Sequence, residues 1–289
     1  MALKYTFSGH ESFPCKSLWL KKGFDFCQQG GSFSSPQAVV SLGVGKNMVT
    51  SINYWMKAFQ LLKDNQLSDI AQYIFDEERG KDPYLEDIAT IWILHYLLAS
   101  RKENTLYNWT FTQFQRERKS FTKEQLEQYV KRVMVERDAI KLFNENTVHK
   151  DVLVLCQNYI RPNQTKNYDE FSQLLIELNL ISELEGKQNG KTLCHFNTES
   201  KSGIPLEIVL FAILYDMSEE TTFTFDMLRK IGLIFCMTDS ELIAVLQSIS
   251  QRYPQHAVYS DVAGVKQLQL IKELTWKSVL DNYYNNETL

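Results

Sequence analysis

The sequence predicts a mainly α protein with small β wings, and three observations indicate this class. Apolar residues recur every three or four positions along several stretches of the 289 residues, as on one face of a helix. Capping signatures open two of these stretches. Short β-prone runs lie near glycines at residues 186–196 and 257–270. The 12 Gly, 6 Pro and 44% hydrophobic residues are typical of a folded globular chain and argue against extensive disorder.

Polar and charged stretches at residues 76–82 and 161–168 divide the chain into three predicted domains. Residues 1–78 are expected to form a winged helix-turn-helix that binds DNA. Residues 79–162 are expected to form a helical middle. Residues 163–289 are expected to form an α+β region resembling a winged helix, with an architectural or partner-binding role.

In the first domain, Ser35-Pro36 predicts the start of a short helix that runs to Leu42, since Ser caps a helix and Pro fits its first position. Gly43-Val44-Gly45 predicts a tight turn. A long amphipathic helix is then expected from Lys46 to about Leu62. Residues 67–75 would close the domain as a short edge strand or helix.

The other two domains contain more helices and two strand pairs. In the middle domain we expect helices at 85–100, 122–143 and 149–159, the second opened by a capping box at Thr122–Gln125. In the C-terminal domain we expect helices at 168–178, 205–216, 225–231 and 240–251, the last opened by a capping box at Thr238–Glu241. Strands are expected at 186–190, 191–196, 257–260 and 265–270.

Charge is distributed unevenly along the chain, whose net charge is −4. Residues 1–75 carry seven Lys and four Asp or Glu, which gives +3. Residues 76–160 carry 13 basic and 14 acidic residues, and residues 161–289 carry 11 and 17. A phosphate backbone would therefore meet the first block, and the acidic last block more plausibly meets protein.

The helix expected at residues 46–62 has two contrasting faces. Its apolar stripe has spacings of four, three, four and three residues and consists of Met48, Ile52, Trp55, Phe59 and Leu62. The opposite face lies about 200° round the helix and consists of Lys46, Thr50, Asn53 and Lys57. A helix-turn-helix needs this arrangement, since its second helix packs on the first while its other face enters the major groove.

Each residue of the polar face suits a contact with duplex DNA. Lys46 and Asn47 lie at the helix N-terminus, where the dipole and free amides favour phosphate. Asn53 could read an adenine edge, and Thr50 a thymine methyl group or a phosphate. Three further cations, which could grip the flanking backbone, are Lys16, Lys21 and Lys22. The alternative is an ordinary surface helix with a solvated polar face.

A second basic patch follows in the middle domain. Its cations are Arg101, Lys102, Arg116, Arg118 and Lys119, interleaved with Trp109, Phe111 and Phe114. Such a pattern suits a surface that binds single strands or phosphates; alternatively, the aromatic residues belong to the core. The helices expected at 225–231 and 240–251 resemble a second helix-turn-helix, which we call the C-terminal lookalike, with an outer face of Ser240, Ala244, Gln247 and Gln251. It places Asp239 and Glu241 where phosphate would approach, so it is expected to be architectural or a dimer or partner surface.

No convincing catalytic, cofactor or metal motif is found. The turn Gly43–Lys46 lacks the first Gly and the Ser or Thr of a phosphate loop. Two Glu-x-Lys triplets, Glu185–Lys187 and Glu199–Lys201, leave open a metal-dependent nuclease. The five dispersed cysteines suggest reduced thiols. Since neither a signal peptide nor a membrane span is recognised, a cytoplasmic protein is expected.

Several blocks of the chain resemble the bacterial family of domain of unknown function 4007. These blocks are Gly9–Cys15, Trp19–Lys22, Leu42–Val49, Tyr54-Trp55, Asp82–Asp87, Trp92 with His95, and Asp261–Val265. The family has no assigned activity. Its members tend to sit beside a phosphoadenosine-phosphosulfate-reductase-like protein and other components of DNA sulfur modification or phage defence.

The resemblance implies an accessory subunit of a phosphorothioation-like defence system. That subunit would either recognise DNA or act as a scaffold for the reductase-like partner, and a homodimer is a further open alternative. Within the motif Gly9–Cys15, His10 and Glu11 are either part of a working site or hydrogen-bonded locally in a folded N-terminal cap.

Overall fold

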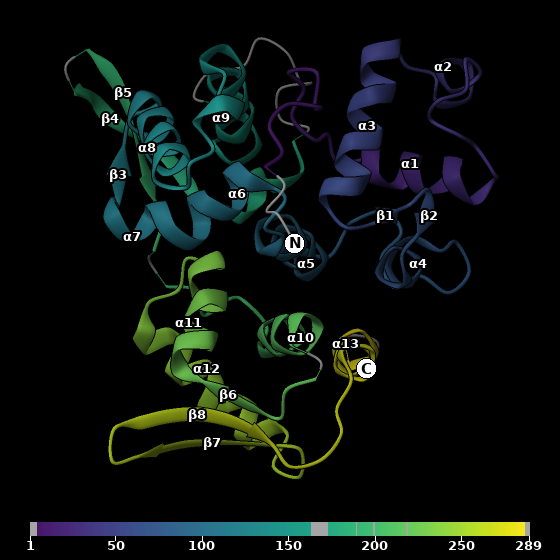
Figure 1. The fold of residues 1–289 in the computed structure, drawn as a ribbon. Helices are drawn as coiled ribbons and strands as arrows, with labels where there is room; N and C mark the ends of the chain where they lie inside the picture. The colour runs from purple at the N-terminus through teal and green to yellow at the C-terminus, as the bar shows by residue number, and fades with distance from the viewer. Residues whose placement is uncertain (1–4, 163–172, 189, 199, 218, 287–289) are drawn as a thin grey trace. The chain divides into compact units, whose positions relative to one another are not determined.

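The computed structural model describes residues 5–162, 173–188, 190–198, 200–217 and 219–286. The chain divides into two compact units, residues 1–197 and 198–289 (Figure 1). Helices dominate both units and the sheets are small and antiparallel, which confirms the mainly α class with small β elements. The expected domain limits at residues 78 and 162 both fall inside the first unit, and the three-part division stays a prediction.

The first unit opens with three packed helices, α1 (Trp19–Gln28), α2 (Ala38–Leu42) and α3 (Lys46–Ala58). Helix α2 begins at Ala38, two residues after the expected first residue Pro36. It ends at Gly43, which adopts the left-handed φ of 62° that glycine tolerates best. Helix α3 ends at Ala58 because Gln60 takes a φ of 58°, so the expected extension to Leu62 is wrong.

A minimal hairpin follows α3. Strands β1 (Leu62–Lys63) and β2 (Gln66–Leu67) pair around Asp64 and Asn65, whose φ values of 50° and 62° suit a two-residue hairpin turn. Helix α4 (Asp69–Phe75) comes next, so residues 69–75 are helical and not an edge strand.

The centre of the first unit is α5 (Ile88–Ser100), in which every residue from Ala89 to Ala99 is buried. Helix α6 (Thr105–Trp109) continues through the π-helical turn η1 (Thr110–Phe114) into α7 (Gln115–Glu117). Helix α8 (Lys123–Glu136) has the expected capping box between Thr122 and Gln125 but ends seven residues before Phe143. The short helix η2 (Ile140–Leu142) leads to α9 (Glu145–Tyr159).

A three-stranded sheet completes this unit. Strands β3 (Ser120–Phe121), β5 (Lys191–Phe196) and β4 (Ile181–Gln188) lie in that order. The expected strand pair is therefore confirmed, although β4 begins five residues earlier than expected. Of the helix expected at 168–178, the part up to residue 172 lies outside the described residues, and Leu174–Leu178 forms the 3-10 helix η4.

The second unit alternates helices with a small sheet. Its elements are α10 (Leu206–Asp216), β6 (Thr222–Thr224), α11 (Phe225–Ile234), α12 (Asp239–Arg252), β7 (Ala257–Val262), β8 (Val265–Leu270) and α13 (Trp276–Asn286). The sheet order is β6-β8-β7, and the capping box at Thr238 is present. Helix α13, which packs on α10, was not expected.

Among the described residues, no single helix is both long and apolar enough to cross a bilayer. Helices α11 and α12 are long and apolar enough only when they are taken together, and the chain bends by 109° between them.

Candidate nucleic-acid interface

Helix α3 buries the side that the sequence predicts. Ile52, Trp55 and Phe59 are fully buried, Leu62 just beyond the helix is 2% exposed, and Met48 is half-buried. On the opposite side Lys46, Asn47, Thr50 and Lys57 are all exposed. The helix therefore offers a polar face that includes two lysines.

Asn53 departs from this picture. It is only partly exposed, and its Oδ1 atom is buried without a hydrogen-bond partner among the described residues. The surrounding chain covers the carbonyl end of the amide that would read an adenine edge. Asn53 is therefore not included in the candidate interface.

Two further cations flank the exposed side of α3. Lys22 Nζ donates a hydrogen bond to the carbonyl oxygen of Leu42 at 3.1 Å, which places its ammonium beside the turn that precedes α3. Arg101 donates to the carbonyl oxygen of Lys57 at 2.7 Å, at the other end of the helix. We call the set Lys22, Lys46, Asn47, Thr50, Lys57 and Arg101 the α3 basic face.

Charge near the Arg101 end is partly balanced. Glu103 lies 3.4 Å from the Arg101 guanidinium, and both side chains are at least one-third exposed. Lys102, next to them, is exposed. An exposed pair of this kind is weak, so Arg101 can exchange its carboxylate partner for a phosphate at little cost.

Two of the expected DNA contacts lie elsewhere. Lys21 is buried, with its Nζ 2.6 Å from Asp25 and 3.4 Å from the carbonyl oxygen of Phe75. Lys21 belongs to the buried face of α1, because one residue along a helix turns the side chain by about 100° from that of Lys22. Lys16 is half-buried, forms a β-bridge to Gln173 and lines a pocket together with Lys123 and Glu183.

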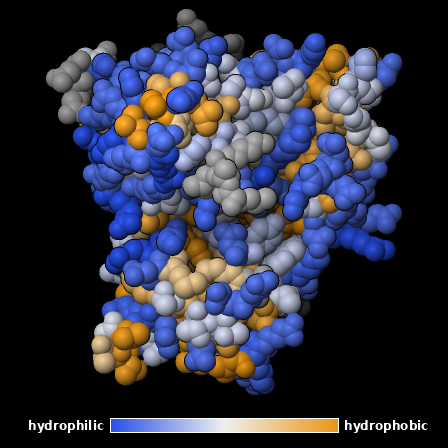
Figure 2. Space-filling view, viewed as in Figure 1, coloured by the Kyte–Doolittle hydropathy of each residue, from blue (hydrophilic) through white to orange (hydrophobic). Residues whose placement is uncertain are grey.

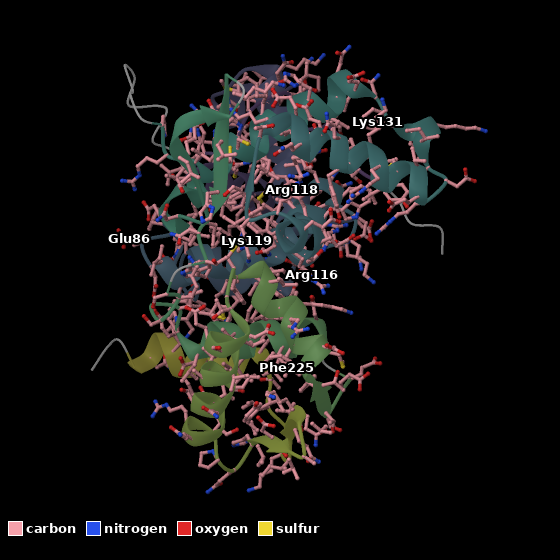
Figure 3. The ribbon with its side chains drawn as sticks, turned by 90° about the vertical axis from the view of Figure 1, so that its left-hand side faces the viewer. Glu86, Arg116, Arg118, Lys119, Lys131 and Phe225 are labelled. Atoms are coloured by element: carbon pink, nitrogen blue, oxygen red, sulfur yellow. The ribbon has the colours of Figure 1, made fainter. Side chains whose placement is uncertain are left out.

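The second basic patch is not one surface. Arg101 and Lys102 lie at the end of α3, whereas Arg116, Arg118 and Lys119 lie around α7, at the opposite end of the first unit (Figures 1 and 3). The interleaved aromatic residues Trp109, Phe111 and Phe114 are at most 2% exposed, so no base can stack on them. The interpretation of these rings as core is the correct one, and Arg116, Arg118 and Lys119 form an exposed charged surface.

The motif Gly9–Cys15 is folded against α3 and α9. His10 is 4% exposed, and its Nε2 lies 2.8 Å from Asp151 Oδ1. Its Nδ1 accepts a hydrogen bond from the Ser12 amide at 3.1 Å, so Nε2 carries a proton and donates to Asp151. Asp151 also accepts from the Ser8 amide at 2.9 Å.

Other groups of the motif extend this attachment. The Trp55 indole on α3 donates to the carbonyl oxygen of Phe13 at 3.2 Å. The amide of Cys15 donates to Asn158 Oδ1 on α9 at 2.9 Å. Burial, followed by the charge of Asp151, raises the pKa of Tyr54, which packs against His10. The motif thus joins α3 to α9, with His10 inside and Glu11 exposed.

Asp151 and Asn158 were not recognised as site residues from the sequence. The available signal was two polar residues on the buried side of the helix expected at 149–159. A buried polar side chain needs a partner. The partner of Asp151 is His10, which lies 141 positions away in the sequence, so no local spacing rule could identify it.

The C-terminal lookalike has the expected charge distribution, with acidic residues at the start of α12 and no cation in the expected positions of its outer side. Arg229 Nε donates to Asp239 at 3.1 Å, and Glu241 completes the capping box. The outer side of α12 is exposed and carries no cation in its four expected positions, Ser240, Ala244, Gln247 and Gln251. The side chains of Glu185 and Lys187, and residue Glu199, lie outside the description, while Lys201 is buried.

No group of three His, Cys, Asp or Glu side chains that could hold a metal ion occurs within the described part of the chain.

Together, the fold and this site define a mainly α protein of two units with an exposed basic helix. The chain belongs to the family described as protein of unknown function DUF4007, whose model matches residues 7–284. A crystal structure of magnesium-ion-bound SspB is similar to it, with a TM-score of 0.80 and 26% identity over 97% of this chain and 88% of that one. A second SspB crystal structure has the same TM-score and coverage at 24% identity. No curated protein matches the chain.

Proposed function

We propose that this chain is a DNA-binding accessory subunit of a phosphorothioation-like DNA-modification and phage-defence system, and that it contacts duplex DNA through the α3 basic face. The observation that carries the proposal is the exposure of Lys46, Asn47, Thr50 and Lys57 on one side of a helix whose other side is buried. Membership of the DUF4007 family and the likeness to SspB support the assignment to such a system.

The α3 basic face has the chemistry that a duplex requires. The N-terminus of α3 presents free amides together with Lys46 and Asn47, which suits a phosphate. Lys22 and Arg101 extend the positive charge beyond both ends of the helix, where a groove-bound helix meets the two flanking backbones. The small β1–β2 hairpin follows α3 in the position of a wing, with Lys63 and Gln66 exposed.

The test is duplex binding by fluorescence anisotropy over a range of salt concentrations. Affinity should fall steeply with salt, since each neutralised phosphate contributes about −0.9 to the slope of log K against log salt. Lys46→Glu combined with Lys57→Glu should weaken binding at least about tenfold and reduce the steepness of that slope by about 2. The matched control is Lys119→Glu combined with Lys131→Glu, which changes two exposed lysines away from α3. Equal binding by both double variants would refute the proposal.

A second function, as a docking scaffold for a reductase-like partner, is favoured by the sheet of the second unit. Its helix–strand–helix–helix–strand–strand order is compatible with the expected resemblance to a winged helix, in which β7–β8 would be the wing. The register places one set of side chains on the outer face: Thr222, Thr224, Val258, Ser260, Val262, Val265, Gln267 and Gln269. The opposite face carries buried Phe223 and Leu268.

This outer face carries no charge, although residues 198–289 contain 12 acidic and 7 basic residues. Val262 and Val265 at the wing tip are 70% and 62% exposed, and Figure 2 shows the tip as hydrophobic. An uncharged face with an apolar tip suits a protein partner, and the net negative charge of the unit around it disfavours DNA. Val262→Asp combined with Val265→Asp should abolish co-purification of the neighbour-encoded partner. Val135→Asp, at an exposed valine of the first unit, should not.

The magnesium-bound state of the SspB relative keeps a metal-dependent nuclease open for this chain. Supercoiled plasmid incubated with Mg²⁺ or Mn²⁺ distinguishes the functions. Conversion to open circles would replace the accessory role by a catalytic one.

A further inference from the structure

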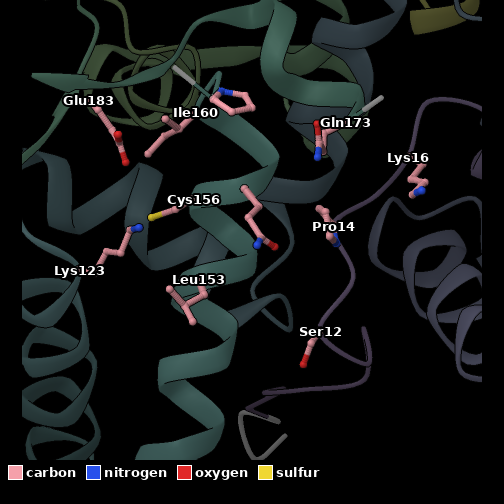
Figure 4. A pocket seen from close by; sticks show the side chains of 11 residues that line it. Ser12, Pro14, Lys16, Lys123, Leu153, Cys156, Ile160, Gln173 and Glu183 are labelled. Carbon is pink, nitrogen blue, oxygen red and sulfur yellow. The ribbon is translucent and has the colours of Figure 1, made fainter. Parts of the chain in front are cut away.

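A pocket of about 480 Å³ lies between α9, the start of α8, β4 and the segment that follows the His10 motif (Figure 4). All of these elements belong to the first unit, and no residue of the α3 basic face lines the pocket. Small-molecule sites in proteins have volumes of roughly 300 to 1,000 Å³. The pocket is therefore large enough for a small organic ligand.

One wall of this pocket carries two opposite charges that do not pair with each other. Lys123 is the first residue of α8, Glu183 lies on β4, and both side chains are half-buried. Figure 4 shows both of them directed into the space beside Cys156. Within the part of the chain that the structure describes, neither side chain forms an ion pair or a hydrogen bond. A half-buried charge gains from a partner, so this wall can hold one carboxylate and one ammonium of a ligand.

The rest of the lining is apolar along α9 and polar beyond it. Leu153 of α9 and Ile160 just after the helix supply apolar contacts. Lys16 and Gln173, which are joined by a β-bridge, lie on the other side of the view from Lys123 in Figure 4. A ligand would therefore cross an apolar stretch between its charged groups and a polar far end.

This arrangement of charges argues against a phosphate ligand. A phosphate is held best by several donors that converge on it, whereas Lys16 and Lys123 lie on opposite sides of the pocket. The Glu183 carboxylate, on the same wall as Lys123, would repel an ion with two negative charges. A ligand with one positive and one negative group satisfies Lys123 and Glu183 together.

We infer that the pocket binds a zwitterion of the α-amino acid class, whose carboxylate contacts the Lys123 ammonium and whose ammonium contacts the Glu183 carboxylate. The ligand side chain packs on Leu153 and Ile160 and ends near Gln173, which favours a polar end such as an amide. A free amino acid and a short peptide both carry this pair of charges, and the volume of the pocket admits either. This binding site is independent of the proposed contact with DNA.

The first experiment is isothermal titration calorimetry on the full wild-type chain. The probes are the common amino acids, tested singly, glycyl dipeptides and adenosine monophosphate. At least one amino acid or dipeptide should bind saturably at millimolar concentration, and the tighter class identifies the source of the ligand. The N-acetyl and amide derivatives of that binder each lack one charge and should bind at least about tenfold more weakly. Absence of binding by every zwitterion, equal binding of the blocked derivatives, or tighter binding of adenosine monophosphate would overturn the inference.

The second experiment assigns the two charges to their residues. Glu183→Gln and Lys123→Met should each weaken the best binder at least about tenfold. Glu183→Gln should leave the weaker affinity for the N-acetyl derivative unchanged, because that derivative has no ammonium to lose. This comparison of two ligands within one variant separates a lost contact from a loss of folding. The matched controls are Glu177→Gln and Lys131→Met, which remove the same charges at exposed positions and should bind as wild type does. Equal affinities in the pocket variants and their controls would contradict the assignment.

Discussion

His10 Nε2 and Asp151 Oδ1 lie 2.8 Å apart and join the N-terminal segment to α9 across 141 sequence positions. Both residues are buried, and the same carboxylate accepts the Ser8 amide. The His10 ring also packs against Tyr54 and Trp55, so the same motif connects α9 to α3.

Asp151→Ala should lower the free energy of unfolding by about 2 to 4 kcal/mol, because it leaves the buried His10 ring without its acceptor and also removes the acceptor of the Ser8 amide. Urea titration followed by tryptophan fluorescence measures the change. Lys150→Ala, an exposed neighbour on the same helix, should stay within about 0.5 kcal/mol of wild type. Equal stability of the two variants would mean that the His10–Asp151 contact contributes little.

Gly9→Ala should destabilise the chain more than Gly30→Ala. Both glycines have a positive φ, of 110° and 81°, so both substitutions strain the backbone. A Cβ at Gly9 would lie 2.6 Å from the Tyr54 ring, whereas nothing lies within 4 Å of one at Gly30. Thermal denaturation of the two variants should show the larger loss for Gly9→Ala. The reverse order would contradict the packing of the motif on α3.

A comparison of Lys22→Met with Lys21→Met should distinguish an exposed lysine that contacts DNA from a buried lysine that only packs within the unit. If α3 enters a groove, Lys22→Met loses about one phosphate contact and reduces the steepness of the salt dependence by about 0.9. Lys21→Met removes a cation that is already buried beside Asp25, and should leave that dependence unchanged. Anisotropy titrations at several salt concentrations compare the two. A change in Lys21→Met equal to that in Lys22→Met would argue for a nonspecific effect of net charge.

Stability should fall as the pH rises from 9 towards 11. Burial raises the pKa of Cys27 from 9.0 to about 11, so the unfolded chain loses this proton first. The folded state then binds more protons than the unfolded state, and the free energy of unfolding decreases with pH in this window. Urea titrations at pH 8 and pH 10.5 measure the loss. Cys27→Ser should show a smaller loss, because serine does not titrate there; an unchanged loss would assign the effect to other groups.

Local patterns predicted much of this fold. The 3.6-residue period placed the buried side of α3, and the capping boxes at Thr122 and Thr238 were found as expected. These features depend on neighbours within a turn or two of helix. Helix α13 was missed because only Val279, Leu280 and Tyr284 are buried in a mostly polar stretch.

The candidate site was less predictable. Lys21 and Lys22 have the same chemistry, and only the packing of α1 decides which of them meets solvent. The burial of the Asn53 amide oxygen and the His10–Asp151 contact come from segments distant in sequence. The basic residues at 101–119 form one patch in the sequence, but the sequence alone does not show that α5 to α7 carry them to different parts of the unit. The partner and a possible self-association stay predictions.

Contacts on the buried side and at the C-terminal end of α3 restrict its motion, and this has a consequence for the proposed binding of DNA. The Trp55 indole donates a hydrogen bond to the carbonyl oxygen of Phe13, and the Tyr54 ring packs against Gly9. At the C-terminal end of the helix, Arg101 donates to the carbonyl oxygen of Lys57. A helix fixed in this way has little conformational entropy left to lose when it meets a ligand. If α3 binds DNA as proposed, its association should proceed as a rigid-body encounter, with a rate governed by long-range electrostatic attraction and not by folding of the helix.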